Sequence, residues 1–132
     1  MAQYRIGEEV PREEDLRLLR GRGRYVDDVK SVNEARAYVL RSPYGSARIK
    51  SIDTSAARQM EGVLCVLTGE DAKARGLGAF FPVFPRKRKD GSNQFFRGQP
   101  ILAQGAVRYV GDPVAFVVAE TLNQAKDAAE QI

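Results

Sequence analysis

The sequence contains no histidine and a single cysteine, Cys65, among its 132 residues. Histidine is the usual proton shuttle near neutral pH and the commonest metal ligand in proteins. Catalytic machinery of the serine–histidine or cysteine–histidine kind is therefore excluded within this chain. A single cysteine also excludes an intrachain disulfide, a CxxC motif and a zinc site built from cysteines.

Long hydrophobic runs are also missing. The longest apolar stretches are Val63–Leu67 and Pro113–Ala119, far short of the ~20 residues that span a bilayer. The first residues lead into charged sequence without the apolar core of a secretory signal. We therefore expect a cytoplasmic protein with no membrane span. Hydrophobic residues make up 43% and charged residues 29% of the chain, which is ordinary for one globular domain.

Residue patterning predicts an α+β fold in which a few helices cover one face of a small mixed sheet. We predict strands over residues 35–41, 47–52, 63–67, 107–110 and 113–119. We predict short helices after Pro11, over 55–60, from Thr68 to Gly76, and from Thr121 onward. Thr68 with Asp71, and Thr121 with Gln124, have the spacing of capping boxes.

Three further expectations follow from this pattern. Strands 63–67 and 113–119 are apolar at every position, so we expect both of their faces to be buried. The last helix meets no glycine or proline. We therefore expect it to continue to Ile132, as in a chain cut from a longer polypeptide. We treat residues 1–132 as one domain.

Two segments depart from this pattern. Residues 1–34 form a highly charged N-terminal segment. Residues 77–106 form a long excursion that contains three of the six prolines, with a predicted hairpin turn at Asp90-Gly91. A structureless loop of this length is unusual inside a compact domain. We therefore expect the excursion to pack on something outside this chain.

Glycines and paired acids in the N-terminal segment suggest two candidate sites. Gly21-Arg22-Gly23 resembles part of a dinucleotide-binding loop, but Val26 stands where the third glycine belongs, and a charged helix precedes it instead of a strand. We favour a turn that ends the helix. Asp27-Asp28 offers two carboxylates, but adjacent side chains in an extended loop point apart. We favour local ion pairs with Arg22, Arg24 or Lys30.

The basic run Arg86-Lys87-Arg88-Lys89 is the best case for nucleic acid. Basic groups neutralise phosphates, and aromatic side chains stack on bases. The neighbouring aromatics and arginine are Phe80, Phe81, Phe84, Phe95, Phe96 and Arg97. The net charge is only +4 and the phenylalanines lie beside prolines, as buried loop anchors do. We favour a solvated turn or a protein contact, and keep a standalone basic nucleic-acid-binding module as the alternative function.

Two further groups are weighed in the same way. Cys65 lies in the most apolar predicted strand, where burial makes a thiol inert, so we expect it to pack in the core. Tyr109, Gly111, Asp112 and Glu120 bracket the last strand. Either Tyr109 or Glu120 could serve in acid–base chemistry with a shifted pKa, but turn and cap roles are favoured.

Many short motifs in order resemble the opening of the molybdopterin-binding large subunit of the molybdenum hydroxylases, the family of xanthine dehydrogenase, aldehyde oxidase and aerobic carbon monoxide dehydrogenase. The first is Ile6-Gly7-x-x-Val10-Pro11-Arg12-x-Glu14-Asp15-x-Arg17-Leu18-Leu19-Arg20-Gly21-x-Gly23-x-Tyr25-x-Asp27-Asp28. The others are Arg41-Ser42-Pro43, Leu67-Thr68-Gly69-Glu70-Asp71, Pro100-Ile101-Leu102-Ala103, Val107-Arg108-Tyr109-Val110-Gly111-Asp112-Pro113-Val114-Ala115 and Val118-Ala119-Glu120-Thr121. The chain departs from the family at Tyr44-Gly45-Ser46, where the family often has small residues and histidines.

The resemblance implies the α/β-hammerhead domain that begins this subunit. It implies a parent enzyme that oxidises carbon monoxide, aldehydes or N-heterocycles with a molybdopterin-type cofactor, alongside iron–sulfur and FAD partner subunits. The cofactor-binding and catalytic motifs of the family belong to later domains. We therefore assign no catalytic, cofactor-binding or metal-binding residue to this chain. We expect it to be a structural domain that docks on the remaining domains and sister subunits, and to be inactive alone.

Overall fold

The computed structural model describes residue 7 and residues 12–84 and 86–132. The chain divides into two compact units, residues 1–32 and 33–132. Ile6, Val10 and Pro11 of the opening motif lie outside the described residues. The first unit carries helix α1 (Asp15–Leu19) and the short 3-10 helix η1 (Val26–Asp28).

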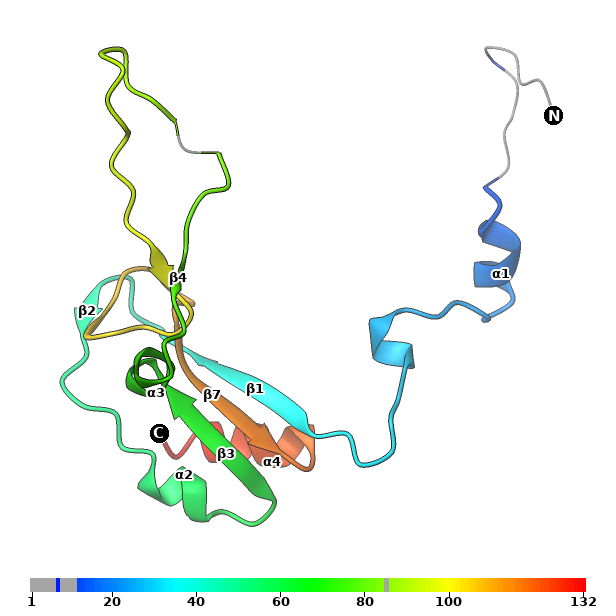
Figure 1. Cartoon of the computed structure of the whole chain (residues 1–132). Helices are drawn as coiled ribbons and strands as arrows, with labels where there is room; N and C mark the ends of the chain where they lie inside the picture. Colours follow the sequence, from blue (N-terminus) through cyan, green and yellow to red (C-terminus); the bar gives the residue numbers. More distant parts are fainter. Residues whose placement is uncertain (1–6, 8–11, 85) are drawn as a thin grey trace. The chain divides into compact units, whose positions relative to one another are not determined.

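The second unit is organised around a three-stranded antiparallel sheet in the order β1-β7-β3 (Figure 1). These strands are β1 (Arg36–Arg41), β3 (Val63–Thr68) and β7 (Pro113–Ala119). The central strand β7 is apolar throughout and has no exposed residue, as expected for a strand with neighbours on both edges. The pairing shifts register between Leu40 and Arg41 in β1, and between Val63 and Cys65 in β3.

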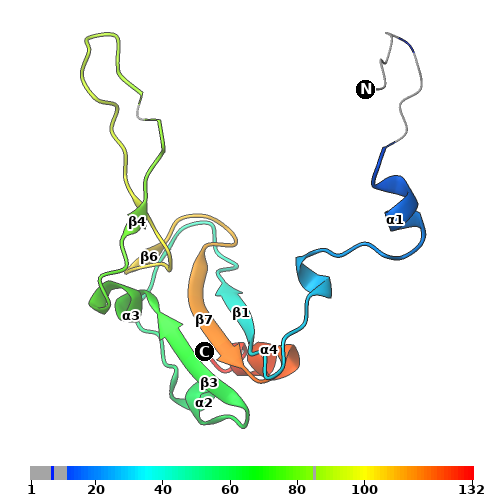
Figure 2. The ribbon, with the colours of Figure 1, turned by 45° about the vertical axis from the view of Figure 1, so that its right-hand side comes forward.

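Helices cover one face of this sheet (Figures 1 and 2). α4 (Leu122–Ala129) packs on β1 and β7, and α2 (Ser55–Gln59) packs on β3 and α4. The core between them consists mainly of small side chains: Ala57, Val66, Val117, Ala119, Ala125, Ala128 and Ala129. Leu40, Met60, Val63 and Ile132 pack around its edge. The predicted layer of helices on one sheet face is confirmed.

Two small ladders lie beyond the main sheet. β2 (Ala47–Arg48) pairs with β6 (Ala106–Val107), and β4 (Ala79–Phe80) pairs with β5 (Gln99–Pro100). The predicted strands 47–52 and 107–110 are therefore too long. Residues 108–112 form a turn instead, because the Asp112 carboxylate accepts a hydrogen bond from the backbone N–H of Arg108 at 2.9 Å.

The excursion is a β-hairpin that projects from the base formed by β4 and β5 (Figures 1 and 2). Its turn lies at the predicted Asp90-Gly91. Gly91 has φ +80 and donates its N–H to the carbonyl of Arg88 at 3.0 Å, and Lys87 bridges to Asn93. The β4–β5 base is not predicted from the sequence, because strands of two residues show no alternation of apolar and polar side chains.

Helix termini follow the capping signals. α3 (Gly69–Ala74) begins with the Thr68–Asp71 capping box, and α4 with the Thr121–Gln124 box. The expectation that the last helix continues to Ile132 is wrong. Helix α4 ends at Ala129 with Glu130 as its C-cap, and the remaining backbone closes tighter turns, with Gln131 N–H donating to Ala128.

Candidate functional site

The glycine loop of the first unit ends a helix. Gly21, with φ +66, donates its N–H to the carbonyl of Leu18 at 3.0 Å, and Arg22 donates to the carbonyl of Arg17 at 3.0 Å. This pair of bonds is a Schellman motif, which satisfies the last carbonyls of α1 and requires a left-handed residue that glycine adopts without strain. The helix-ending interpretation of Gly21-Arg22-Gly23 is confirmed.

The paired acids Asp27 and Asp28 do not form the predicted ion pairs. Asp28 accepts a hydrogen bond from the backbone N–H of Tyr25 at 2.9 Å and so caps η1. The described part of the chain has three ion pairs, Arg17–Glu14, Arg36–Glu34 and Arg58–Asp71. The Asp28 carboxylate binds the backbone N–H of Tyr25, three residues away, instead of the side chain of an arginine or lysine.

The four residues that bracket β7 occupy turns at its opposite ends. Asp112 is buried and holds the turn, Gly111 has φ +90, and the Tyr109 hydroxyl accepts a hydrogen bond from Gln99. Glu120 follows the other end of the strand, ~20 Å away for seven residues at ~3.3 Å each. Turn roles are confirmed for Gly111 and Asp112, and the structure does not bring Glu120 and Tyr109 together.

Two of the resemblance motifs meet at one end of β7. The backbone N–H of Ser42 donates to the carbonyl of Asp112 at 2.9 Å, and the N–H of Gly111 donates to the carbonyl of Ser42 at 2.8 Å. Arg41 donates through Nη1 to the carbonyl of Gly111 at 2.9 Å. Arg41-Ser42-Pro43 and Gly111-Asp112-Pro113 thus form one interlocked corner.

A second pair of motifs meets at the start of α3. A Cβ on Gly69 would lie 2.2 Å from the carbonyl oxygen of Ala103, so only glycine fits there. The Gln104 amide donates to the carbonyl of Gly69 at 3.3 Å. Leu67–Asp71 and Pro100–Ala103 are therefore packed against each other. These motifs join elements of the fold.

An arginine that the sequence analysis did not single out ties three elements together. Arg58 on α2 donates through Nη2 to the carbonyl of Val66 in β3 at 2.8 Å and through Nε to the Thr54 hydroxyl at 2.9 Å. Its Nη2 lies 3.7 Å from Asp71 on α3. Asp71 also accepts bonds from the N–H and hydroxyl of Thr68, and these bonds are the main cause of its lowered pKa. Local spacing does not signal this network, because Val66 and Asp71 are eight and thirteen positions from Arg58, and only Thr54 is within one helical turn.

The sheet face opposite the helices is apolar and carries Cys65. Register places six side chains on this open face: Ala37, Val39, Cys65, Leu67, Phe116 and Val118. Ala37 and Cys65 are exposed and the other four are half-buried. The expectations that Cys65 packs in the core and that both faces of strand 63–67 are buried are therefore wrong. β3 is an outer strand, and no helix in the described part of the chain covers this face.

A hollow of about 220 Å³ continues the open face toward α3. Its lining is Leu67, Ala72, Arg75, Leu77, Ile101, Leu102 and Phe116. Leu67 and Phe116 thus belong to both surfaces. Together they make an extended apolar surface on the second unit, and contiguous exposed apolar surface marks a binding interface in soluble proteins.

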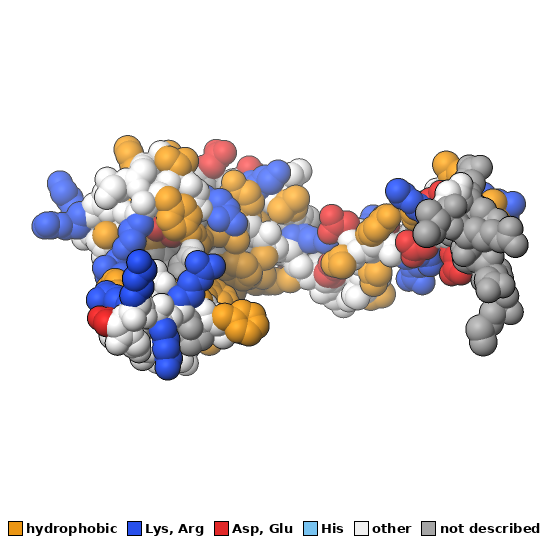
Figure 3. Space-filling view, turned by 90° about the horizontal axis from the view of Figure 1, so that it is seen from above, with side chains coloured by type: hydrophobic (Ala, Val, Ile, Leu, Met, Phe, Trp, Pro, Cys, Tyr) orange, Lys and Arg blue, Asp and Glu red, His pale blue; other side chains and the backbone are white. Residues whose placement is uncertain are grey.

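The hairpin carries exposed aromatic and basic side chains. Phe84 is 85% and Phe95 76% exposed, and Arg86, Lys87 and Arg88 are exposed beside them. Figure 3 looks onto this end of the larger unit, where blue basic and orange apolar side chains are interspersed. The phenylalanines therefore do not anchor the loop to its own domain. The basic run forms an exposed turn, which is compatible with both the solvated turn and the protein contact that the sequence favours.

The described residues offer neither a metal-binding cluster nor a membrane-spanning helix. No three side chains of the His, Cys, Asp or Glu type gather there closely enough to hold a metal ion. No helix among these residues is both long enough and apolar enough to cross a bilayer.

The fold and its surfaces define a small α+β domain with an interlocked motif scaffold and an open apolar face. A family model described as "Aldehyde oxidase and xanthine dehydrogenase, a/b hammerhead domain" matches residues 20–132. The chain belongs to this family, as its motifs predicted, and the α/β-hammerhead fold is confirmed.

Named relatives agree with this assignment. The chain is 41% identical over 127 residues to the nicotine 6-hydroxylase large subunit of Paenarthrobacter nicotinovorans, covering 96% of this chain and 15% of that protein. It is 40% identical over 121 residues to the carbon monoxide dehydrogenase large chain of Afipia carboxidovorans, covering 92% and 14%. The structure of quinoline 2-oxidoreductase from Pseudomonas putida 86 matches with a TM-score of 0.76 and 40% identity, covering 96% and 15%. The chain thus spans about a seventh of these proteins.

Proposed function

We propose that this chain serves as the structural hammerhead domain of a molybdenum-containing hydroxylase or dehydrogenase, and that the bond-making residues of that enzyme lie outside it. The proposal treats residues 1–132 as one domain of a longer large subunit. The oxidation of carbon monoxide, an aldehyde or an N-heterocycle would be the activity of the parent enzyme. The single observation that carries the proposal is the open apolar face of a chain that belongs to this family.

The open face supports docking because its side chains are apolar, as in the interior of a protein. Six apolar side chains occupy one side of the sheet, and the adjoining hollow adds further apolar lining. Burial of such surface stabilises an interface by roughly 25 cal/mol per Å². We propose that the remaining domains of the same subunit cover this face, and that the hairpin contacts those domains or a sister subunit.

The cofactors of the parent enzyme are proposed to lie outside this chain. Metal-ligating side chains do not gather in the described part of the chain, and its one thiol, Cys65, stands exposed on an outer strand. These residues do not fit a redox centre. We therefore assign the molybdopterin-type cofactor to the rest of the large subunit, and the iron–sulfur and FAD groups to partner subunits. We propose in addition that this chain contributes no catalytic, cofactor-binding or metal-binding residue.

The docking role is tested by transplanting the chain. It replaces the matching segment of the nicotine 6-hydroxylase large subunit, and the chimera is compared with variants Ala37→Glu and Cys65→Glu on the open face. Both positions are exposed, so the isolated chain keeps its thermal stability while a buried charge at a domain contact prevents assembly. We expect the chimera to assemble with molybdenum bound, and both variants to lose assembly.

Val110→Glu is the matched control, since Val110 lies in the turn after β6 and is 70% exposed. It should assemble like the unmodified chimera. Normal assembly of both open-face variants would contradict docking through this face. Stoichiometric molybdenum in the purified 132-residue chain, measured by mass spectrometry, would contradict the assignment of the cofactor to other parts of the enzyme.

A further inference from the structure

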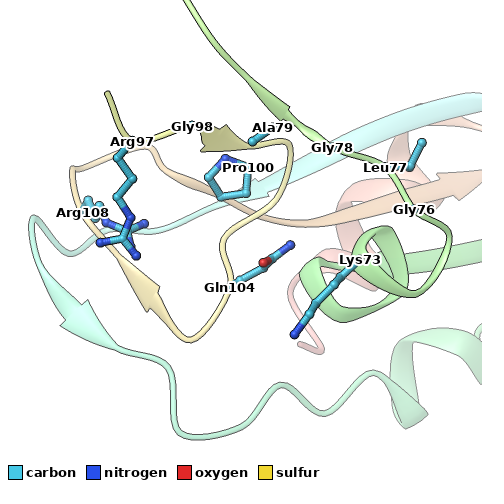
Figure 4. Close-up of a pocket in the computed structure, with 10 residues that line it drawn as sticks. All are labelled: Lys73, Gly76, Leu77, Gly78, Ala79, Arg97, Gly98, Pro100, Gln104 and Arg108. Carbon is cyan, nitrogen blue, oxygen red and sulfur yellow. The ribbon is translucent and has the colours of Figure 1, made fainter. Parts of the chain in front are cut away.

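A second hollow, of about 400 Å³, lies at the base of the hairpin (Figure 4). It is bounded on one side by the end of α3 and on the other by residues next to β5 and β6. Lys73 comes from the last turn of α3, Arg97 from the segment before β5, and Arg108 from the turn after β6. Segments from three separate parts of the sequence therefore meet around one space.

This hollow gathers positive charge with no acidic residue in its own lining. Its charged lining residues are Lys73, Arg97 and Arg108. None of the three forms an ion pair within the described residues. Asp112 lies in an adjoining hollow that Arg97 and Arg108 also line, but its Oδ2 accepts the backbone N–H of Arg108. Three like charges around one space repel one another, and a bound anion relieves that repulsion.

Backbone hydrogen bonds order two of the segments that carry these exposed side chains. α3 begins with a capping box at Thr68 and ends in a Schellman motif, where Gly76 donates to Lys73 and Leu77 to Ala72, both at 3.0 Å. The backbone N–H of Arg108 donates to the Asp112 carboxylate, which orders the turn that carries this arginine. A site on such anchored segments loses less conformational entropy when a ligand binds.

The remaining lining suits an organic group beside the anion. Leu77, Ala79 and Pro100 provide apolar walls, and the Gln104 side chain reaches into the space between Lys73 and the two arginines (Figure 4). The volume exceeds what a single inorganic anion fills. Arginine forks pair bidentately with phosphate and with carboxylate oxygens. The three positive charges of the lining favour a multiply charged phosphate over a single carboxylate.

We propose that this hollow binds a phosphate or diphosphate group, either free or carried by a small organic molecule such as a nucleotide. In the bound state Arg97 and Arg108 donate to the phosphate oxygens from one side and Lys73 from the other. The organic part, where there is one, lies against Leu77 and Pro100. The site uses neither the six side chains of the open face nor the hairpin tip, and it shares only Leu77 with the hollow that adjoins the open face.

The experiment is a titration of the 132-residue chain, followed by backbone NMR shifts and calorimetry, with pyrophosphate, ADP, adenosine and succinate. We expect saturable binding of pyrophosphate in the ~1 mM range or tighter, with shifts centred on residues 73–79, 97–100 and 104–108. Tighter binding of ADP than of pyrophosphate identifies an esterified phosphate as the ligand type, and equal binding identifies the free anion. Adenosine and succinate should not compete.

Charge-removing variants localise the binding. Lys73→Gln, Arg97→Gln and Arg108→Gln all change exposed side chains, and each should weaken pyrophosphate binding about tenfold through loss of a charged hydrogen bond. Arg88→Gln and Lys89→Gln remove the same charge from the hairpin tip and should change it less than about twofold. Absence of saturable binding, an equal loss in the tip variants, or equal binding of succinate would overturn the proposal.

Discussion

In the layer formed by the β1-β7-β3 sheet with α2 and α4, the buried side chains are mostly alanine, whereas the hairpin beyond β4 and β5 holds phenylalanines that are largely exposed. Alanines let the helices approach the sheet closely, and a few valines fill what remains. The hairpin has larger apolar groups but no face of its own domain to cover them. Burial in this unit is decided by the presence of an opposing surface, and side-chain size is secondary.

The largest effect is expected in the alanine-rich layer. Val117 is fully buried at the centre of β7 and touches a core with little room to collapse. Val117→Ala should lower the free energy of unfolding by about 2 kcal/mol, because it loses buried methyl groups and leaves a cavity. Urea denaturation followed by circular dichroism measures this change. If the free energy of unfolding falls by less than about 0.5 kcal/mol, the layer repacks around the cavity. Burial would then not distinguish this layer from the hairpin.

A smaller effect is expected where the two regions meet, at the start of α3. Asp71→Asn removes the carboxylate that accepts both Thr68 donors and should cost about 1 kcal/mol at neutral pH. The folded-state pKa of Asp71 is lowered, chiefly by these hydrogen bonds. The stabilisation is therefore complete above the unfolded value of ~3.9 and is lost as the pH falls through the folded pKa.

The measurement for Asp71 is urea denaturation of wild type and variant from pH 7 down to pH 2. The difference between the two should shrink only in the acidic part of this range. Asp127→Asn is the control, since this exposed carboxylate on α4 has no hydrogen-bond partner in the described part of the chain. A difference that stays constant down to pH 2 would show that the carboxylate charge is irrelevant.

The smallest effect is expected at the hairpin. Phe84 is 85% exposed, so Phe84→Ala should change the free energy of unfolding by less than about 0.5 kcal/mol, although it deletes more atoms than Val117→Ala. The same urea experiment compares the two directly. A loss above about 1 kcal/mol would place Phe84 in a packed cluster and remove the distinction between the two regions.

Sequence patterns predicted the parts of this fold that depend on near neighbours. The Thr68–Asp71 and Thr121–Gln124 boxes and the turn at Asp90-Gly91 all form as predicted, because their partners lie within a few residues. The failures share a cause. The apolar strand predicts a buried Cys65, which is wrong. The sequence alone does not show which strand is outermost or which face of the sheet the helices cover.

The candidate anion site could not be predicted from the sequence, because it too depends on contacts between distant segments. Lys73, Arg97 and Arg108 are far apart in the chain, and only the folding of the hairpin base on α3 brings them to one hollow. The interlocked corner of Ser42 and Asp112 is equally non-local. What revealed the family was the order of many short motifs, and in the structure four of them join in pairs, at the Ser42–Asp112 corner and at the Gly69–Ala103 contact.

The two register shifts in the main sheet have a practical consequence for the behaviour of this polypeptide. At Leu40/Arg41 the extra residue is Val114 of the central strand β7, whereas at Val63/Cys65 it is Leu64 of the outer strand β3. Such bulges twist a strand locally and make its rim a poor template for a foreign strand. The β3 edge of the domain is thus guarded against edge-to-edge aggregation.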